Sequence, residues 1–398
     1  MRPAVPPCAP KRPAPNRPSP SIYTSTVISP LNDLNWRSFL ARPPLPSPPP
    51  DAIEALLHQP ILITGAGGSI GSALALRLAA LAPSKLVLLE ASESNIYALQ
   101  RDWAEFQAAN PRATCPIKPV LGSAADQPLL DEIFALHAPR LVFHAAAFKH
   151  VPLMEEQPLA AISNNIFVTR ILTETAAAHC ARVVFLSTDK AVQPASVMGA
   201  TKRVAEQIVL SSGGIVLRLA NVLASRDSVA EVFTRQIAQG GPVTVTDPAA
   251  RRYFVTLHEA VSLLLIAAAH PKPGTLLAPV LPAPHFIADL ARFMVHELAP
   301  NREIPIAFTG LRPGDKETED LWPSSASTFP TNLDGIISVE TPLLPAPQLA
   351  SRLTSLRQAL EFRDLDVALT QLHRLLPDYT PSPALLALSR QSAQRVAL

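Results

Sequence analysis

The chain has few cysteines, few charged residues and no long apolar run. Its three cysteines, Cys8, Cys115 and Cys180, are an odd number, lie far apart and form no Cys-x-x-Cys pair, which argues against both a disulfide framework and a zinc cluster. No run of about 18 apolar residues is present, and the first residues lack the apolar stretch of a signal peptide. We therefore expect a cytoplasmic protein with no transmembrane segment and no metal centre.

Charged residues make up only 17% of the 398 residues and hydrophobic residues 48%, so disorder can be at most local. This length allows two or three domains with a large buried core. The net charge of +2 does not demand a polyanionic partner, and we expect no nucleic acid to bind.

Proline is concentrated at the start of the chain, where residues 1–50 hold 15 of the 43 prolines and six Lys or Arg against one Asp. Such a density argues against regular helix or sheet and predicts an extended, solvated tail. A ligand for a proline-recognition domain is the alternative, which composition favours less than a plain linker.

From Asp51 onward, apolar runs of strand length alternate with stretches of helical period, which is typical of a parallel sheet covered by helices. The predicted strands are Pro60–Thr64, Lys85–Glu90, Ile117–Leu121, Arg140–His144, Val183–Ser187 and Gly214–Leu219. The predicted helices between them are Ser69–Leu81, Asn95–Asn110, Gln127–Leu136, Asn164–Ala178 and Ser196–Leu210. Six strands joined in this way predict an α/β fold with a doubly wound parallel sheet, a Rossmann domain, over residues 51–241.

The alternation weakens around Pro242, where proline and glycine separate shorter elements, and this predicts a smaller C-terminal substrate-binding lobe over residues 242–330. Residues 331–398 complete the chain. Leucines at helical spacing between residues 343 and 378 predict two closing helices there.

A predicted strand runs directly into a glycine-rich turn, and together they read ILITGAGGSIG from residue 61 to residue 71. Glycines at these positions permit a tight turn, close approach of the backbone to a pyrophosphate, and close packing of the next helix. Glu90 ends the second strand 19 residues after the last glycine, near the spacing of about 20 expected for an acid that binds ribose hydroxyls. No Arg or Lys follows closely, so we predict NAD rather than NADP, although a solvated Glu90 is the alternative. The predicted NAD-binding residues of this region are Gly65, Gly68, Ser69, Ile70, Gly71 and Glu90.

A second polar group, Thr188-Asp189-Lys190, follows the fifth predicted strand. Ligands of α/β sheets sit beyond the carboxyl ends of the strands, so these side chains would face the nicotinamide. Asp189 and Lys190 offer a proton donor and a proton acceptor, although adjacent opposite charges are more commonly a surface salt bridge. Their position at a strand end favours a site. His144 lies among apolar residues, which favours a core histidine.

Six stretches of the chain carry a family resemblance. They are TGAGGSIGS (64–72), HAAAFKHVPLMEEQP (144–158), STDKAVQPASVMGATKR (187–203), RLANVLASRDSVAEVFTRQIAQGGPVTVTDP (218–248), RRYFVTLHEAV (251–261) and FTGLRPGDKETEDLW (308–322). In this order they resemble the CapD-like polysaccharide biosynthesis proteins, nucleotide-sugar 4,6-dehydratases of the extended short-chain dehydrogenase/reductase superfamily. The resemblance covers residues 39–379, and residues 39–43 are similar to the linker that follows transmembrane helices in longer members.

The resemblance implies conversion of UDP-N-acetylglucosamine to a UDP-4-keto-6-deoxy sugar, with NAD reduced and reoxidised in each turnover. It implies Asp189 as the acid at C6, Lys190 as the base at C5 and Thr188 as a helper at the C4 hydroxyl. An acid at Asp189 would require a raised pKa. The residues that the resemblance places around the UDP-sugar are Lys149, Asn221, Arg252 and Arg312. Arginine suits a diphosphate through bidentate hydrogen bonds, while loop capping is the alternative for Asn221 and Arg312.

Most of the wider superfamily has Tyr-x-x-x-Lys, whereas this chain has Met198 at the tyrosine position and keeps Lys202. A thioether cannot transfer a proton. The longer CapD-like dehydratases resemble this Met type, which is associated with retention of configuration at C5. By the same resemblance, Lys202 would hold the nicotinamide ribose.

Two other functions stay open. A UDP-sugar 4-epimerase shares the fold but would want the tyrosine that Met198 replaces. A non-catalytic NAD-binding scaffold of polysaccharide assembly is permitted by Met198 and by the proline-rich tail, although the intact residues 188–190 weigh against it. We further expect a homo-oligomer.

Overall fold

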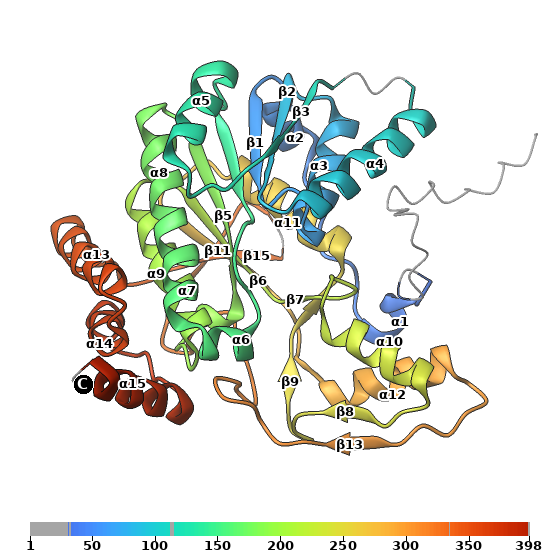
Figure 1. The fold of residues 1–398 in the computed structure, drawn as a ribbon. Coiled ribbons are helices and arrows are strands. Elements are labelled where there is room, and N and C mark those ends of the chain that lie inside the picture. Colours follow the sequence, from blue (N-terminus) through green and yellow to red (C-terminus); the bar gives the residue numbers. More distant parts are fainter. Residues whose placement is uncertain (1–30, 32, 112–114, 334, 397–398) are drawn as a thin grey trace, which may run out of the picture.

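The computed structural model describes residues 31, 33–111, 115–333 and 335–396, and a nine-stranded sheet forms its centre (Figure 1). The parallel strands are β1 (Pro60–Thr64), β2 (Lys85–Glu90), β3 (Ile117–Leu121), β4 (Leu141–His144), β5 (Arg182–Thr188), β6 (Ile215–Leu219) and β11 (Thr275–Pro279). Two antiparallel strands, β15 (Ile336–Val339) and β14 (Thr328–Pro330), extend the sheet beyond β11. The order β14-β15-β11-β6-β5-β4-β1-β2-β3 confirms the doubly wound Rossmann fold.

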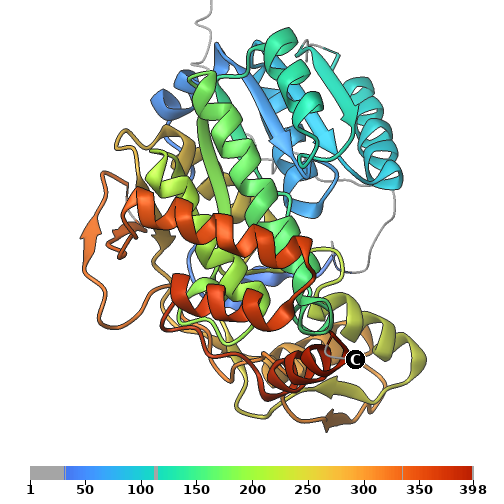
Figure 2. The same ribbon diagram turned by 60° about the vertical axis from the view of Figure 1, so that its left-hand side comes forward.

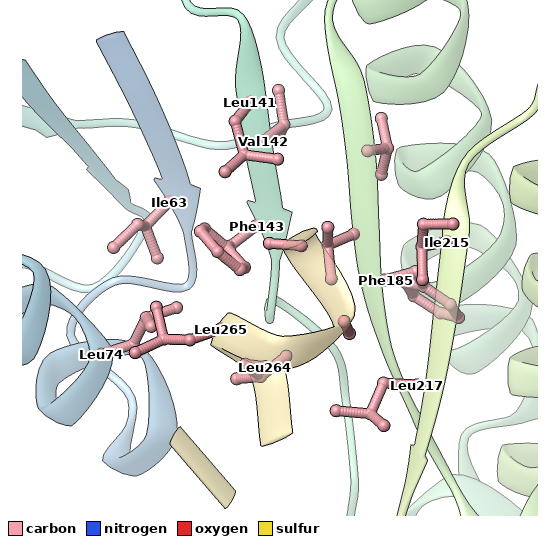
Figure 3. Close-up of a cluster of buried hydrophobic side chains, with 14 of the residues drawn as sticks. Ile63, Leu74, Leu141, Val142, Phe143, Phe185, Ile215, Leu217, Leu264 and Leu265 are labelled. Atoms are coloured by element: carbon pink, nitrogen blue, oxygen red, sulfur yellow. The ribbon is translucent and has the colours of Figure 1, made fainter. Parts of the chain in front are cut away.

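Helices cover both faces of the sheet (Figure 1). One face carries α2 (Pro50–Leu57), α3 (Ser69–Leu81), α4 (Glu93–Ala109) and α11 (Leu257–Ala269). The other face carries α5 (Gln127–His137), α8 (Thr169–Ala178) and α9 (Val197–Ser211). Because both faces are buried, the central strands are continuous apolar runs, and Figure 3 shows Phe143 and Phe185 among the core side chains.

The predicted strands and helices of residues 60–219 agree closely with the structure. Three strands have the predicted ends, β4 and β6 begin one residue later than predicted, and β5 extends one residue further at each end. The helix predicted over residues 164–178 is divided, because Ser163–Val168 form a π-helical turn before α8 begins. Within this wider turn, the Asn165 side chain bonds the backbone N–H and carbonyl of Phe148, at 2.8 and 3.0 Å.

A smaller lobe lies beyond the carboxyl edge of the sheet (Figure 1). It comprises α10 (Val229–Gln239), α12 (Ile287–Leu298) and the strand pairs β7 (Asn221–Val222) with β10 (Phe254–Val255), β9 (Arg251–Arg252) with β12 (His285–Phe286), and β8 (Val243–Val245) with β13 (Ile306–Phe308). The prediction of one continuous lobe over residues 242–330 is wrong, because α11 and β11 return to the main sheet. Helix α11 is buried on nearly all sides, as expected for a helix in the main core and not for one on the surface of a small lobe.

The prediction of a solvated tail is wrong for residues 33–50, which we call the N-terminal strap; residues 1–30 and 32 lie outside the described residues. The strap contains α1 (Trp36–Leu40) and adds Leu34 and Leu40 to the core of the lobe. Arg42 then forms a bidentate ion pair with Glu259 on α11, with N···O distances of 2.7 and 2.9 Å. The apolar residues of this segment bury their side chains against the lobe, and this is not evident from the high proline content.

The two predicted closing helices are present as α13 (Ala346–Glu361) and α14 (Leu365–Leu375), and a third, α15 (Pro383–Val396), follows them. They share a hydrophobic cluster with α6 (Val151–Glu156), α7 (Pro158–Ile162) and α9, and Figure 2 shows them in red and orange along that face. Across the described ranges, no helix combines the length and apolar character needed to cross a membrane.

Candidate active site

A cleft of about 590 Å³ opens at the carboxyl ends of the parallel strands. Its walls are the turn after β1, the end of β2, the loop after β4, the end of β5, the first turns of α9 and the loop after β7. The predicted site residues that line it are Gly65, Gly68, Ser69, Ile70, Gly71, Glu90, Lys149, Thr188, Lys190, Lys202 and Asn221. The topology thus brings together residues that are up to 156 positions apart in the chain, as expected for a ligand site of this fold.

The glycine-rich turn has no room for side chains where the backbone must pass. Gly65 has a φ of +67°, and a Cβ there would lie 2.7 Å from the backbone nitrogen of Ala146. A Cβ on Gly71 would lie 2.2 Å from the carbonyl oxygen of Gly65, so only glycine lets α3 start this close to the turn. The bare backbone and the N-terminus of α3 face the cleft, and this cradle fits a dinucleotide pyrophosphate.

Glu90 stands at the end of β2 with its carboxylate fixed against the glycine-rich turn. Its Oε2 accepts a hydrogen bond of 2.9 Å from the Gly67 N–H, and its Oε1 accepts one of 3.0 Å from the Ser92 N–H. The side chain is buried at the cleft wall. This position suits a carboxylate that receives the hydroxyls of an adenosine ribose.

Thr188, Asp189 and Lys190, which we call the TDK turn, form a connected polar cluster. Asp189 Oδ1 lies 2.9 Å from Lys190 Nζ and accepts a 2.8 Å hydrogen bond from Thr188 Oγ1. Asp189 Oδ2 accepts a bond of 3.1 Å from Asn221 Nδ2. The Asp189 side chain is 1% exposed and the Lys190 side chain 20%. Lys190 lines the cleft, and Asp189 is buried behind it and is not among the lining residues, so the pair is not the surface salt bridge that the sequence left open.

The charge state of Asp189 differs from the expectation. Burial alone would raise its pKa, but the Lys190 ammonium and the hydrogen bonds to Lys190 and Thr188 outweigh burial and hold the pKa below its usual value. The expected raised pKa is thus wrong for the structure as it stands. The sequence shows that the two residues are adjacent, but it does not show the 2.9 Å contact that stabilises the ionised form of the carboxyl group.

Helix α9 begins directly against the TDK turn. A Cβ on Gly199 would lie 2.2 Å from the Lys190 carbonyl oxygen, so glycine is required for this contact. Met198 is buried at the cleft wall, where it offers no exchangeable proton. Lys202 Nζ donates to the Leu186 carbonyl at 2.5 Å, and burial lowers the pKa of Lys202 to about 7.

The residues predicted to bind the UDP-sugar separate into two pairs. Lys149 and Asn221 line the cleft. Arg252 is not among the cleft residues, and its guanidinium binds the backbone carbonyls of Lys316 and Glu317 and that of its neighbour Arg251. Arg312 also lies outside the lining and forms an exposed ion pair of 2.8 Å with Asp315. Their predicted roles in substrate binding stay predictions.

His144 is a core histidine, as the sequence favoured. Its Nδ1 lies 2.7 Å from Thr64 Oγ1, and its Nε2 lies 2.9 Å from Thr169 Oγ1. Burial lowers the pKa of His144 to about 3, so the ring is neutral at physiological pH. It serves the packing of β1 and β4 rather than proton transfer.

Sequence reasoning assigned no role to three polar residues that the fold brings near this site. Arg226 reaches the glycine-rich turn from the loop after β7. Glu155 accepts hydrogen bonds from the first N–H of α9 and from Ser382 Oγ. Glu319 is buried with its Oε2 3.1 Å from Lys316 Nζ, and burial raises its pKa. All three lie in stretches that carry the family resemblance, 144–158, 218–248 and 308–322, but the local sequence pattern does not show that the fold brings them near the cleft.

A family model described as polysaccharide biosynthesis protein matches residues 61–341, which include the glycine-rich turn and the TDK turn. The chain belongs to the polysaccharide biosynthesis protein family. It is 38% identical over 302 residues to the probable polysaccharide biosynthesis protein EpsC of Bacillus subtilis (strain 168), covering 73% of this chain and 49% of EpsC. It is 37% identical over 303 residues to the capsular polysaccharide biosynthesis protein CapD of Staphylococcus aureus, covering 74% and 50%. The chain thus spans about half the length of these relatives.

The chain is also similar to enzymes that act on nucleotide sugars. It is 32% identical over 278 residues to a UDP-glucose 4-epimerase of Rickettsia canadensis (strain McKiel), covering 67% of this chain and 78% of the epimerase. The solved structure of Pen from Bacillus thuringiensis has a TM-score of 0.66 and 29% identity, covering 72% of this chain and 89% of Pen. The fold also matches DesIV, a dTDP-glucose 4,6-dehydratase from Streptomyces venezuelae solved with NAD and TYD, with a TM-score of 0.56, 19% identity, and coverage of 65% and 87%. The family resemblance is confirmed; the chain is similar in sequence to a UDP-glucose 4-epimerase and shares its fold with a dTDP-glucose 4,6-dehydratase.

Proposed function

We propose that the protein is an NAD-dependent 4,6-dehydratase that converts UDP-N-acetylglucosamine to a UDP-4-keto-6-deoxy sugar. The hydrogen-bonded pair of Asp189 and Lys190, of which Lys190 lines the cleft, carries this proposal, because elimination of water across C5 and C6 needs a base and an acid side by side. When bound, NAD would accept a hydride from C4 and return it to C6. The backbone of the glycine-rich turn, Glu90 and Lys202 would hold it.

The ion pair in the structure can generate both reacting groups from itself. A proton that moves along the 2.9 Å hydrogen bond from Lys190 Nζ to Asp189 Oδ1 leaves a neutral amine and a neutral carboxylic acid. The amine then takes the C5 proton, while the acid gives its proton to the departing C6 hydroxyl, which leaves as water. This step restores the ion pair.

Retention of configuration at C5 follows from using one base twice. After the hydride returns to C6, Lys190 gives a proton back to C5 from the side on which it removed one. The C4 hydroxyl proton, lost to solvent at the start, balances the proton that the pair regains from solvent at the end. Thr188, whose Oγ1 donates to the same carboxylate oxygen, would hold the C4 hydroxyl.

A UDP-sugar 4-epimerase is the second candidate, because the chain is 32% identical to such an enzyme. Epimerisation at C4 involves no loss of water and does not require a base at C5. Met198 also removes the phenol that would handle the C4 hydroxyl proton.

The experiment that tests the proposal incubates the purified protein with UDP-N-acetylglucosamine and NAD and follows the product by mass. Loss of the mass of one water supports the dehydratase. An unchanged mass with an altered sugar supports the epimerase, and absence of any product supports the scaffold. In deuterated water, the dehydratase product should carry deuterium at C5 with retained configuration.

A further inference from the structure

The loop between β7 and α10, residues 223–228, lines the cleft and is hydrogen-bonded to the glycine-rich turn; we call it the clasp loop. The Arg226 guanidinium donates from Nη2 to the Gly67 carbonyl at 2.7 Å and from Nη1 to Asn95 Oδ1 at 2.9 Å. The backbone N–H of Arg226 donates to Ser69 Oγ at 2.9 Å. One residue of this loop therefore makes three bonds to the wall where a pyrophosphate and an adenosine ribose would lie.

The same residue is also held from the opposite wall. Lys149 Nζ, in the loop after β4, donates to the Arg226 carbonyl at 2.5 Å. Ser225, Arg226 and Asp227 face the cleft together with Glu90. The loop therefore lines the cleft and is bonded to both of its walls, so it can hold these walls together around a bound dinucleotide.

The clasp loop is held in a strained backbone conformation. Ala224 and Asp227, on either side of Arg226, have φ values of +58° and +55°, in the left-handed region that residues other than glycine seldom occupy. Such a conformation persists only where surrounding contacts impose it. The three hydrogen bonds of Arg226 and a 2.7 Å bond from the Asp227 N–H to Glu231 Oε2 hold the loop in this conformation, and losing those of Arg226 would favour an open loop.

We propose that Arg226 is a dinucleotide-retaining residue, which fastens the clasp loop over the adenosine and pyrophosphate half of bound NAD. This inference rests on the proposed function. A reaction without net redox change requires that the reduced dinucleotide stay bound between the two hydride transfers. Arg226 is suited to this role because a guanidinium can bridge two acceptors, whereas an ammonium is a single point of charge.

The test compares the dissociation rate of NAD from the native protein, Arg226→Ala, Arg226→Lys and the control Arg235→Ala, which changes an exposed arginine on α10. We expect Arg226→Ala to raise the rate by roughly tenfold or more, the scale of losing hydrogen bonds to a charged group. Arg226→Lys should fall between the two, and Arg235→Ala should match the native rate. During turnover, Arg226→Ala should also release NADH into solution, detected by a coupled dehydrogenase.

The outcomes separate this inference from the proposed function. If Arg226→Ala binds and releases NAD as the native protein does and leaks no NADH, the clasp is refuted while the dehydratase stands. If the native protein dehydrates its substrate and Arg226→Ala leaks NADH, both stand. A native protein that binds no NAD refutes both. Thermal unfolding of each variant checks that the exposed substitution leaves the fold intact.

Discussion

The TDK turn and the junction between the N-terminal strap and α11 are both polar clusters, but they are assembled in opposite ways. In the TDK turn, the paired charges are adjacent in sequence and stand at the end of a buried strand. At the junction, Arg42 reaches Glu259 across 217 positions of the chain. One cluster is visible as a local pattern, whereas the other exists only because the fold brings its halves together.

The two clusters also differ in what surrounds them. Lys190 is partly exposed and faces an open cleft, so its charge is available to a ligand. Arg42 and Glu259 are each 6% exposed, and the carboxylate also accepts the backbone N–H groups of Leu45 and Thr256. The first arrangement is suited to chemistry and the second to holding segments together. Mutations should separate these two roles.

The largest expected effect is on turnover in the TDK turn. Asp189→Asn and Lys190→Met should each reduce dehydration by on the order of 10² to 10⁴, since each removes one proton-transfer group. Asp189→Asn should stall after oxidation of C4 and accumulate bound NADH, visible in its absorbance. Lys190→Met should also abolish deuterium exchange at C5. If both variants keep near-native dehydration rates, the pair is structural and the mechanism fails.

The next effect concerns stability at the strap junction. Arg42→Ala should lower the free energy of unfolding by about 3–5 kcal/mol, because it leaves the buried Glu259 carboxylate without its partner. The matched control is Arg292→Ala, which breaks an exposed ion pair with Asp289 and should cost about 0–1 kcal/mol. Urea unfolding measures both. Equal losses in the two variants would show that the strap does not stabilise the fold through this pair.

The stabilisation that the Arg42–Glu259 ion pair provides depends on pH. Burial would raise the pKa of Glu259, but the Arg42 side chain and the backbone N–H groups outweigh it and lower the pKa. The resulting stabilisation is fully present above the unfolded pKa of about 4.3 and is lost as the pH falls through the lower folded pKa. Arg42→Ala should therefore flatten the acid side of the stability curve relative to the native protein.

A smaller effect is expected for the choice of cofactor at Glu90. Glu90→Ala should narrow the preference for NAD over NADP by about tenfold, because the repelling carboxylate is removed while Arg226 stays beside Gly67. The double variant Glu90→Ala/Arg226→Ala should bind NADP more weakly than Glu90→Ala alone. Titration of both dinucleotides measures the ratio, and a native protein that prefers NADP would contradict the assignment of Glu90.

The smallest effect is expected at Met198. Met198→Leu nearly conserves volume in a buried position, so activity should stay within about one order of magnitude of native. A loss of several orders of magnitude in kcat would contradict the assignment of proton transfer to Asp189 and Lys190 alone. A small loss of activity in Met198→Leu beside a large loss in Lys190→Met would show that Met198 contributes packing and Lys190 contributes proton transfer.

The parts of the molecule that the sequence predicted well are those that depend on local pattern. Strand β1, the glycine-rich turn and the TDK turn are each contained within a few residues, and their hydrophobic runs and turn residues agree with the fold. Arg226 could not be found in this way, because its partners Gly67 and Asn95 belong to other elements. The prediction of a tail is wrong for the strap, because the number of prolines in a segment contains no information about the surface on which the segment packs.

The predicted sugar-binding arginines show a related limit. Arg252 carries a motif resemblance, but in the structure its guanidinium is taken up by carbonyl oxygens from the segment 316–317 and from its own strand. A motif identifies a residue type at a position and leaves open which neighbours compete for its hydrogen bonds. Glu319 is the converse case, since burial near the TDK turn becomes visible only in three dimensions.

Glu155 links two parts of the chain that are synthesised at very different times. Its carboxylate accepts the Val197 N–H at the start of α9 and the hydroxyl of Ser382, just before α15. While the chain is being translated, α9 can dock on the sheet before Ser382 exists, and the carboxylate then has only one of its two partners. In nascent or C-terminally shortened chains, the sheet could thus be folded while the helix that carries Met198 and Lys202 still lacks part of the contacts that fix its start.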